Sequence, residues 1–348
     1  MTGPATPTAA MQTVLDQLPA LGAKPLETLT PEQARQQPSP ADATAAAAIV
    51  LGQDGLPESV GDVQNRSFAG PAGPVAIRIY WPKDATPTDA GLPVVLYIHG
   101  GGWVIADLDV YDASPRAIAN AAGTIVVSTH YRQGPEDLFP AAHEDTFAAY
   151  RWVLANAGSF GGDATRVALV GESAGGNMAA NIAIRARDEG LQAPLHQVLV
   201  YPVANNDMQS QSYLENATAK PLGKAAMQWF VRYAFQSPDQ AADVRIALVS
   251  QPDLADLPPA TILLAQIDPL RSEGELFAKK LRDAGNDVIV RQWKGVTHEF
   301  FGMGAVLPEA REAQQLAAQR LSEAFERPAT APPVAGLGRD AGSRPSVM

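Results

Sequence analysis

A serine inside a turn framed by glycines constrains this chain more than any other feature of its sequence. Ser173 stands at the centre of residues 171–175, which read Gly-Glu-Ser-Ala-Gly, between an apolar run at residues 166–170 and a helix-like stretch. Where a strand turns this sharply into a helix, side chains two positions either side of the serine would collide with neighbouring elements. The pattern therefore predicts a strand, a tight turn and a helix, with Ser173 as a candidate nucleophile.

A second glycine-rich segment lies N-terminal to the serine. Residues 99–103 read His-Gly-Gly-Gly-Trp and follow a buried-strand pattern at residues 93–98. Acyl transfer places negative charge on the former carbonyl oxygen, and backbone N–H groups of consecutive glycines stabilise it without obstructing the substrate. The N–H group of Ala174 is a further candidate donor. Either motif alone also fits an ordinary glycine-rich turn or loop, but the two in this order favour acyl-transfer chemistry.

The residues that would activate the serine follow later in the chain. In hydrolases built around such a turn, the order is serine, then Asp or Glu, then His. Asp268 directly follows a buried-strand pattern at residues 261–267, and His298 is the only one of five histidines after it. We therefore expect Asp268 to be the acid and His298 to be the base.

The remaining acids and histidines have less favoured interpretations. Alternatives to Asp268 are one acid beside the nucleophile and two on the helix after Asp268, namely Glu172, Glu273 and Glu275. Among the histidines, His99 belongs to the glycine-rich loop, and we expect it to orient that loop through hydrogen bonds. The other three have patterns typical of structural positions, namely His130, His143 and His196.

These motifs together resemble the bacterial hormone-sensitive-lipase-like family of α/β-hydrolase esterases, over about residues 75–325. The matching segments are residues 99–103, 131–136, 139–142, 171–176, 268–271 and 298–302. The resemblance implies a triad of Ser173, Asp268 and His298. It also implies an oxyanion hole made by the N–H groups of Gly101, Gly102 and Ala174. The fold it implies is an α/β-hydrolase fold, a mostly parallel eight-stranded sheet flanked by helices and covered by a helical cap.

Three positions depart from the usual family pattern. Glu172 stands where the family usually has Asp, Gln133-Gly134 where it has Leu-Ala, and Glu299 where it has Gly. None of these changes removes a catalytic group. Glu299 adds charge and bulk beside His298, and a carboxylate there would raise the pKa of the imidazolium.

The function expected from these features is hydrolysis of esters with short to medium acyl chains. The predicted substrate-binding residues are Trp103, Tyr201, Leu270 and Phe300. Alternatives are an amidase or acyltransferase with the same triad, or a non-enzymatic small-molecule receptor on the same fold. No cofactor is expected, because the turn lacks the glycine spacing of a dinucleotide site and the lysine of a phosphate loop. No metal is expected, because residues 143–144 and 298–299 are not followed by the second histidine of the zinc-protease pattern.

Composition and chain organisation narrow the partners. The chain has 348 residues, 46% hydrophobic content, a net charge of −11 and no cysteine. The negative charge argues against nucleic acid or anionic membrane partners. Residues 1–20 lack a signal-peptide pattern and no apolar run approaches membrane-spanning length, so a cytoplasmic protein without membrane insertion is expected. The sequence neither predicts nor excludes a homodimer. Alternating strand and helix patterns predict a core at residues 59–202 and 249–327, cap segments at 1–58 and 203–248, and a disordered tail at 328–348.

Overall fold

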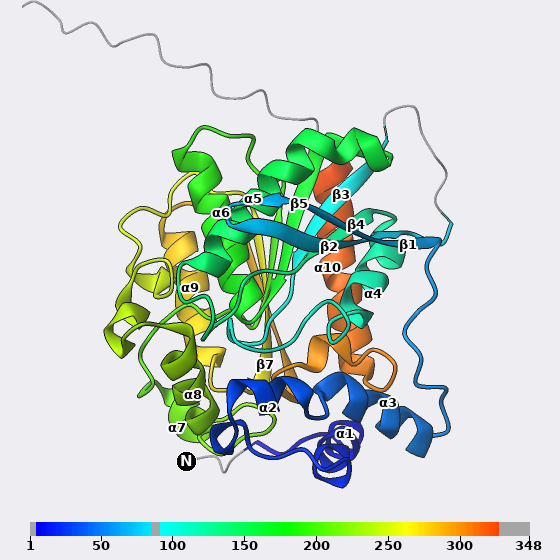
Figure 1. The fold of residues 1–348 in the computed structure, drawn as a ribbon, viewed down its shortest axis with the longest axis vertical. Coiled ribbons are helices and arrows are strands. Elements are labelled where there is room, and N and C mark those ends of the chain that lie inside the picture. Colours follow the sequence, from blue (N-terminus) through cyan, green and yellow to red (C-terminus); the bar gives the residue numbers. More distant parts are fainter. Residues whose placement is uncertain (1–4, 85–90, 327–348) are drawn as a thin grey trace, which may run out of the picture.

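The computed structural model describes residues 5–84 and 91–326, and one eight-stranded sheet organises the chain (Figure 1). The strand order is β1-β2-β4-β3-β5-β6-β7-β8. The first two strands form an antiparallel hairpin, β2 pairs antiparallel with β4, and all other neighbours are parallel. The strands are β1 (Asp62–Gly70), β2 (Gly73–Trp81), β3 (Leu92–Ile98), β4 (Ile125–Thr129), β5 (Gly162–Glu172), β6 (Gln197–Val200), β7 (Ala260–Ile267) and β8 (Val288–Thr297). This architecture confirms the predicted α/β-hydrolase fold.

Helices cover both faces of the sheet, which explains why its central strands are apolar throughout. On one face lie α4 (Ala113–Ala122) and α10 (Pro308–Glu326). The other face carries α5 (Ala141–Asn156), α6 (Ala174–Asp188) and α9 (Arg271–Asp283). Short 3-10 turns η2 (Ala157–Phe160), η4 (Leu248–Ser250) and η5 (Phe300–Gly302) connect these elements.

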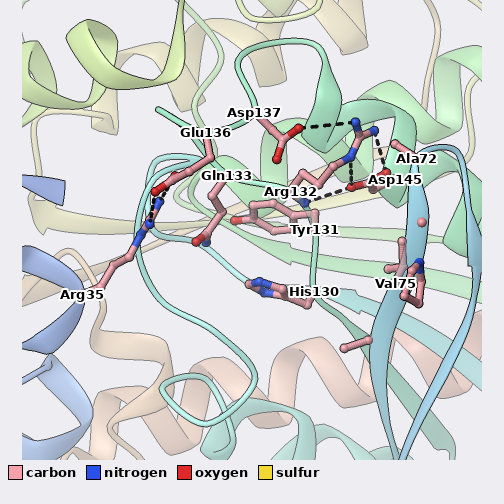
Figure 2. A pocket seen from close by; sticks show the side chains of 13 residues that line it. Arg35, Ala72, Val75, His130, Tyr131, Arg132, Gln133, Glu136, Asp137 and Asp145 are labelled. Atoms are coloured by element: carbon pink, nitrogen blue, oxygen red, sulfur yellow. Dashed lines mark hydrogen bonds and ion pairs between the residues drawn. The ribbon is translucent and has the colours of Figure 1, made fainter. Parts of the chain in front are cut away.

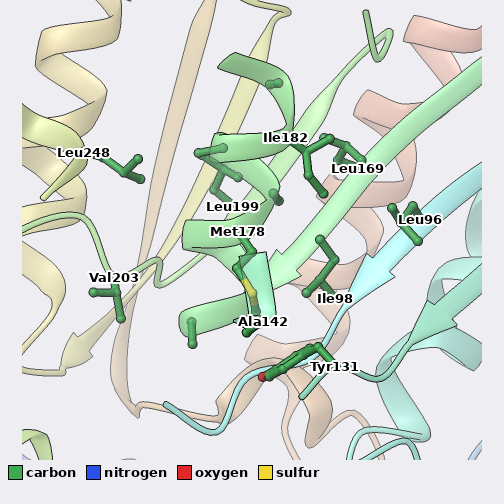
Figure 3. Close-up of a cluster of buried hydrophobic side chains, with 14 of the residues drawn as sticks. Leu96, Ile98, Tyr131, Ala142, Leu169, Met178, Ile182, Leu199, Val203 and Leu248 are labelled. Carbon is green, nitrogen blue, oxygen red and sulfur yellow. The ribbon is translucent and has the colours of Figure 1, made fainter. Parts of the chain in front are cut away.

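Alternate side chains of each strand enter different hydrophobic clusters, because successive residues of a strand point to opposite faces. Leu169 of β5 packs with the cluster under α5 and α6, whereas Val170 joins the cluster under α4 and α10. Figure 3 shows Leu96, Leu169 and Leu199 from three parallel strands, which share one hydrophobic cluster with Met178 of α6. This packing holds the elbow strand and its helix in a fixed relation.

The N-terminal segment and the insertion after β6 lie at the same end of the sheet (Figure 1). The N-terminal segment contains α1 (Ala9–Ala20), η1 (Leu26–Thr28), α2 (Pro31–Gln36) and α3 (Pro40–Val50). The insertion contains α7 (Gln211–Glu215), α8 (Lys224–Ala234) and η3 (Pro238–Ala242). The Trp229 indole N–H donates to the Leu29 carbonyl at 2.8 Å and joins the two parts. The predicted tail at 328–348 lies outside the described residues.

The N-terminal segment is also anchored to the core. Thr8 N–H donates to the Gly295 carbonyl at 2.8 Å, and Met11 is fully buried beside β8. Arg35 of α2 donates to both carboxylate oxygens of Glu136 at 2.8 Å and to the carbonyls of Val104 and Gly134. Charge-assisted, two-pronged contacts of this kind fix geometry as well as adding energy. Within residues 5–84 and 91–326, no helix combines the length and apolar character needed to cross a bilayer.

Candidate active site

The turn between β5 and α6 has the strained geometry that the glycine-framed motif predicts. Ser173 has φ 56° and ψ −118°, a backbone conformation that residues other than glycine rarely adopt. A Cβ atom at Gly171 would overlap the backbone of Gly175, and one at Gly175 would lie 2.6 Å from the His99 carbonyl oxygen. Ser173 N–H donates to the Val200 carbonyl at 2.9 Å. Backbone contacts on all sides therefore hold the serine in place.

Asp268 and His298 come together at the carboxyl ends of two neighbouring parallel strands, β7 and β8. His298 Nδ1 lies 2.7 Å from Asp268 Oδ2, and both side chains are buried. Asp268 Oδ1 accepts a second hydrogen bond from the Leu270 N–H at 2.8 Å. The pair fixes the imidazole orientation and leaves Nε2 as the free ring nitrogen, and His298 lines the same cavity as Ser173.

The electrostatic surroundings of His298 favour its protonated form. Burial lowers the pKa of His298, but the carboxylates of Asp268, Glu299 and Glu172 outweigh that effect and raise the pKa above its ordinary value.

The alternative acids on α9 are engaged elsewhere. Glu273 accepts from the N–H groups of Ala204 and Asn205, while Glu275 lies near Arg271.

The loop after β3 presents glycine backbone to the cavity. Gly101 and Gly102 have φ 97° and 56° and line the cavity with Trp103. A Cβ atom at Gly102 would overlap the ring of Phe230, so only glycine fits beneath α8. Ala174, the third predicted donor, directly follows Ser173 at the start of α6.

His99 stabilises the glycine-rich loop through hydrogen bonds. Its Nδ1 lies 2.8 Å from the Gly100 carbonyl oxygen, and its Nε2 lies 3.1 Å from Nδ1 of His130. Burial lowers the pKa of His99 to about 3, so the ring is neutral and donates from Nδ1. The Tyr131 hydroxyl donates to the carbonyls of His99 and Gly100. This geometry matches the orienting role expected for His99.

Glu172 points away from the cavity, toward the face of the sheet under α4 and α10. The hydroxyls of Tyr97 and Tyr201 each donate to one of its carboxylate oxygens at 2.5 Å. Burial raises the pKa of Glu172 to about 7. Glu172 is therefore a buried support of the elbow strand and of Tyr201, whose ring centre lies 4.3 Å from that of His298.

Three predicted substrate-binding residues do not line the cavity, which corrects the sequence-based expectation. Tyr201, Leu270 and Phe300 are fully buried behind it. Tyr201 and Phe300 pack edge to face, and Tyr201 also contacts His298. The rings of Tyr201 and Phe300 therefore support His298 from behind, whereas Trp103 does reach the cavity wall.

The cavity at Ser173 has a volume of about 590 Å³ and is lined by residues of both candidate cap segments. The N-terminal segment contributes side chains between Leu18 and Pro40, and the insertion contributes side chains between Val203 and Ile246. The cap residues that the sequence analysis did not assign to the pocket include Leu26, Met208, Leu222, Met227 and Phe230. The apolar stripe of α8 signalled some of them, but nothing in the sequence indicated which side faces the serine.

A smaller hollow of about 410 Å³ adjoins this cavity and shares Arg35, His130 and Gln133 with it. Figure 2 shows that its charged groups pair with one another: Arg132 binds Asp145 and Asp137, and Arg35 binds Glu136. Each of these five charged side chains takes part in an ion pair, so none of them is left unpaired for a ligand.

Glu299, the departure from the family pattern beside His298, lies on the cavity wall. Its backbone is left-handed, with φ 72°, and it lines the cavity with Tyr111. Its Oε1 atom lies 3.8 Å from His298 Nε2, and both carboxylate oxygens lie 2.8 Å from the Tyr111 hydroxyl. Burial raises the pKa of Glu299, while His298 and Tyr111 oppose that rise.

The part of the chain that the structure describes contains no cluster of three or more metal-ligating side chains.

A strained serine elbow beside a buried Asp-His pair, on a mostly parallel sheet with a glycine-rich loop, defines the class of α/β-fold serine hydrolases. A family model described as alpha/beta hydrolase fold matches residues 95–302. Esterase LipI of Mycobacterium tuberculosis (strain ATCC 25618 / H37Rv) is 44% identical over 252 residues, which cover 72% of this chain and 78% of that protein.

Two further relatives span more of the chain. Ethyl acetate hydrolase of Pseudomonas putida is 32% identical and covers 86% of this chain and 92% of its own length. The solved structure of a hyperthermophilic esterase from the archaeon Pyrobaculum calidifontis has a TM-score of 0.81 at 33% identity, covering 91% of this chain and 98% of that one. This chain belongs to the hormone-sensitive-lipase-like family of α/β-hydrolase esterases and is an enzyme of the serine carboxylesterase class.

The elbow geometry predicts that Gly175→Ala destabilises the protein by more than about 2 kcal/mol, because the added methyl group meets backbone that cannot move aside. Gly158→Ala is the matched control, since a Cβ atom there has no neighbour within 4 Å. Urea unfolding of both variants measures the difference. Equal stability of the two variants would show that the elbow tolerates a side chain.

Proposed function

We propose that this protein hydrolyses carboxylic esters through an acyl-enzyme formed on Ser173. The observation that carries the proposal is the 2.7 Å contact between Asp268 Oδ2 and His298 Nδ1, with His298 and Ser173 on the wall of one cavity. A buried carboxylate on Nδ1 fixes the tautomer in which Nε2 has a free lone pair. That nitrogen is the base the serine needs.

In the proposed mechanism, His298 Nε2 takes the hydroxyl proton of Ser173 as the serine oxygen attacks the acyl carbon. Asp268 stabilises the imidazolium that results. His298 then protonates the leaving alcohol, and a water molecule repeats the sequence on the acyl-enzyme.

Negative charge on the tetrahedral intermediate requires donors that are already in place. We assign this role to the N–H groups of Gly101, Gly102 and Ala174. The support is the loop geometry: Gly101 and Gly102 line the cavity, and His99 with Tyr131 fixes the preceding carbonyls. Preorganised donors stabilise the transition state without reorganisation cost at the moment of reaction.

We further propose that residues 1–58 and 203–248 act as a two-part cap that limits the acyl chain. Support comes from the lining of the cavity by both segments and from their joint at Trp229 and Leu29. A closed apolar pocket gains about 0.8 kcal/mol for each methylene it buries, until the chain outgrows it. Substrates with short to medium acyl chains follow from this closure.

Ser173→Ala is expected to reduce ester turnover by at least about a thousandfold, because it removes the nucleophile and leaves a folded protein. Ser250→Ala, at an exposed serine, is the matched control and should retain turnover. Initial rates on an activated short-chain ester, beside the matching amide, measure the effect. Near-wild-type turnover by a folded Ser173→Ala protein would defeat the assignment, and absence of hydrolysis in the wild type would favour a receptor.

Activity is expected to fall toward acid pH as His298 becomes protonated, with a midpoint above the ordinary pKa of a histidine, because the nearby carboxylates raise the pKa of His298. Because the Glu299 carboxylate raises the pKa of His298, Glu299→Gln should lower the midpoint, so the variant stays active at more acid pH. Glu275→Gln, at an exposed carboxylate, should leave the midpoint unchanged. The pH profile of kcat/KM tests this expectation, and an unshifted acid limb in Glu299→Gln would contradict it.

Turnover is expected to rise and then decline along a series from acetyl to dodecanoyl esters. Met227→Ala should move the maximum toward longer chains, because Met227 of α8 lines the cavity and its truncation lengthens the space. Initial rates across the series measure the profile. A rate that rises throughout the series in the wild type would rule out a cap that limits chain length.

A further inference from the structure

We infer that Glu299 and Tyr111 form a subsite for a hydroxyl group on the alcohol portion of the ester. The preferred substrates are then hydroxyalkyl esters, such as monoesters of a diol or of glycerol. The inference rests on the proposed function, because it takes His298 Nε2 as the atom that protonates the leaving alcohol. It assigns the substrate group that lies beside that nitrogen.

The backbone directs Glu299 into the cavity. With φ 72°, the residue adopts a left-handed conformation that disfavours a side chain with a Cβ atom. Its carboxylate nonetheless reaches the cavity wall, where 18% of the side chain is exposed. There, its Oε1 atom lies 3.8 Å from His298 Nε2.

The carboxylate has acceptor capacity that the described residues do not fill. Two carboxylate oxygens accept about four hydrogen bonds. Across residues 5–84 and 91–326, the hydroxyl of Tyr111 is the only close donor to them, and it carries a single proton. The remaining capacity of Glu299 faces the cavity, where a substrate donor can use it.

The position of the subsite selects the alcohol side of the ester. Glu299 Oε1 lies 3.8 Å from His298 Nε2, the nitrogen that would hand its proton to the leaving oxygen. On the leaving alcohol, a hydroxyl group on the second carbon from the ester oxygen lies within reach of Glu299. We place the acyl chain on the other side of the reacting carbon, in the apolar part of the cavity that Met227 and Phe230 line.

The adjacent imidazole favours a neutral hydroxyl over a cationic group. His298 becomes an imidazolium in the transition state, and a substrate ammonium beside it would disfavour that charge. A hydroxyl donates to Glu299 without adding positive charge. The carboxylate therefore keeps its stabilising effect on the imidazolium while it binds the substrate.

The test compares two esters of equal size, 2-hydroxyethyl butanoate and propyl butanoate, which differ by a terminal hydroxyl in place of a methyl group. The readout is the ratio of their kcat/KM values at a pH on the activity plateau, because an effect of the substitution on the basicity of His298 cancels in that ratio. We expect the wild-type ratio to exceed that of Glu299→Gly by about tenfold, the loss expected for one hydrogen bond to a charged group. Glycine fits the left-handed backbone at this position.

Two further variants complete the design. Glu299→Gln keeps an acceptor oxygen without charge and should give an intermediate ratio. Glu27→Gln removes another carboxylate from the cavity wall and should keep the wild-type ratio. Circular dichroism and thermal midpoints confirm that each variant is folded.

Equal ratios in the wild type, Glu299→Gln and Glu299→Gly would overturn the subsite while leaving ester hydrolysis intact. A Glu299-dependent preference for butyrylcholine over the hydroxyethyl ester would overturn the choice of a neutral donor. Absence of Ser173-dependent turnover on both esters would instead reject the proposed function, and the subsite with it.

Discussion

The close backbone packing between the start of α6 and the end of β3 determines the rest of the site. Gly175 lies so near the carbonyls of Ile98 and His99 that no side chain fits between them. This contact places Ser173, at the end of one strand, directly beside the glycine-rich loop at the end of the next strand in the sheet. The strain at Ser173 persists because the buried sheet and α6 over-determine its backbone. Position, not flexibility, is what the glycines provide.

Three carboxyl groups lie around the imidazole of His298. Asp268 binds Nδ1, Glu299 faces Nε2, and Glu172 lies beneath the neighbouring Tyr201. These carboxylates differ in their hydrogen-bond donors: Asp268 accepts from a backbone N–H and from His298 Nδ1, Glu172 accepts from two tyrosine hydroxyls, and Glu299 accepts from one. The carboxylate with the fewest donors is also the one on the cavity wall. In the proposed mechanism, this difference separates Asp268, which orients the base, from Glu299, which is available to the substrate.

The sequence predicts those parts of the molecule that local patterns determine. Apolar strands, the glycine-framed turn and the order of Ser173, Asp268 and His298 are all readable, because each follows from strand burial or from turn sterics. The edge strand β1 has mostly polar, partly exposed side chains, and α3 is rich in alanine without a clear apolar stripe, so neither was predicted. Tyr111 meets Glu299 across 188 residues of sequence, a pairing that only the tertiary fold establishes. The burial of Tyr201 behind the cavity has the same origin.

The most direct test of the account is covalent labelling of the nucleophile. Intact-mass measurement after treatment with diethyl 4-nitrophenyl phosphate, followed by peptide mapping, identifies the serine that His298 activates. We expect one diethylphosphoryl group per protein, on Ser173 and in step with loss of esterase activity, because only that hydroxyl is activated by the base. Stoichiometric labelling of another residue, or full loss of activity with Ser173 unmodified, would contradict the account.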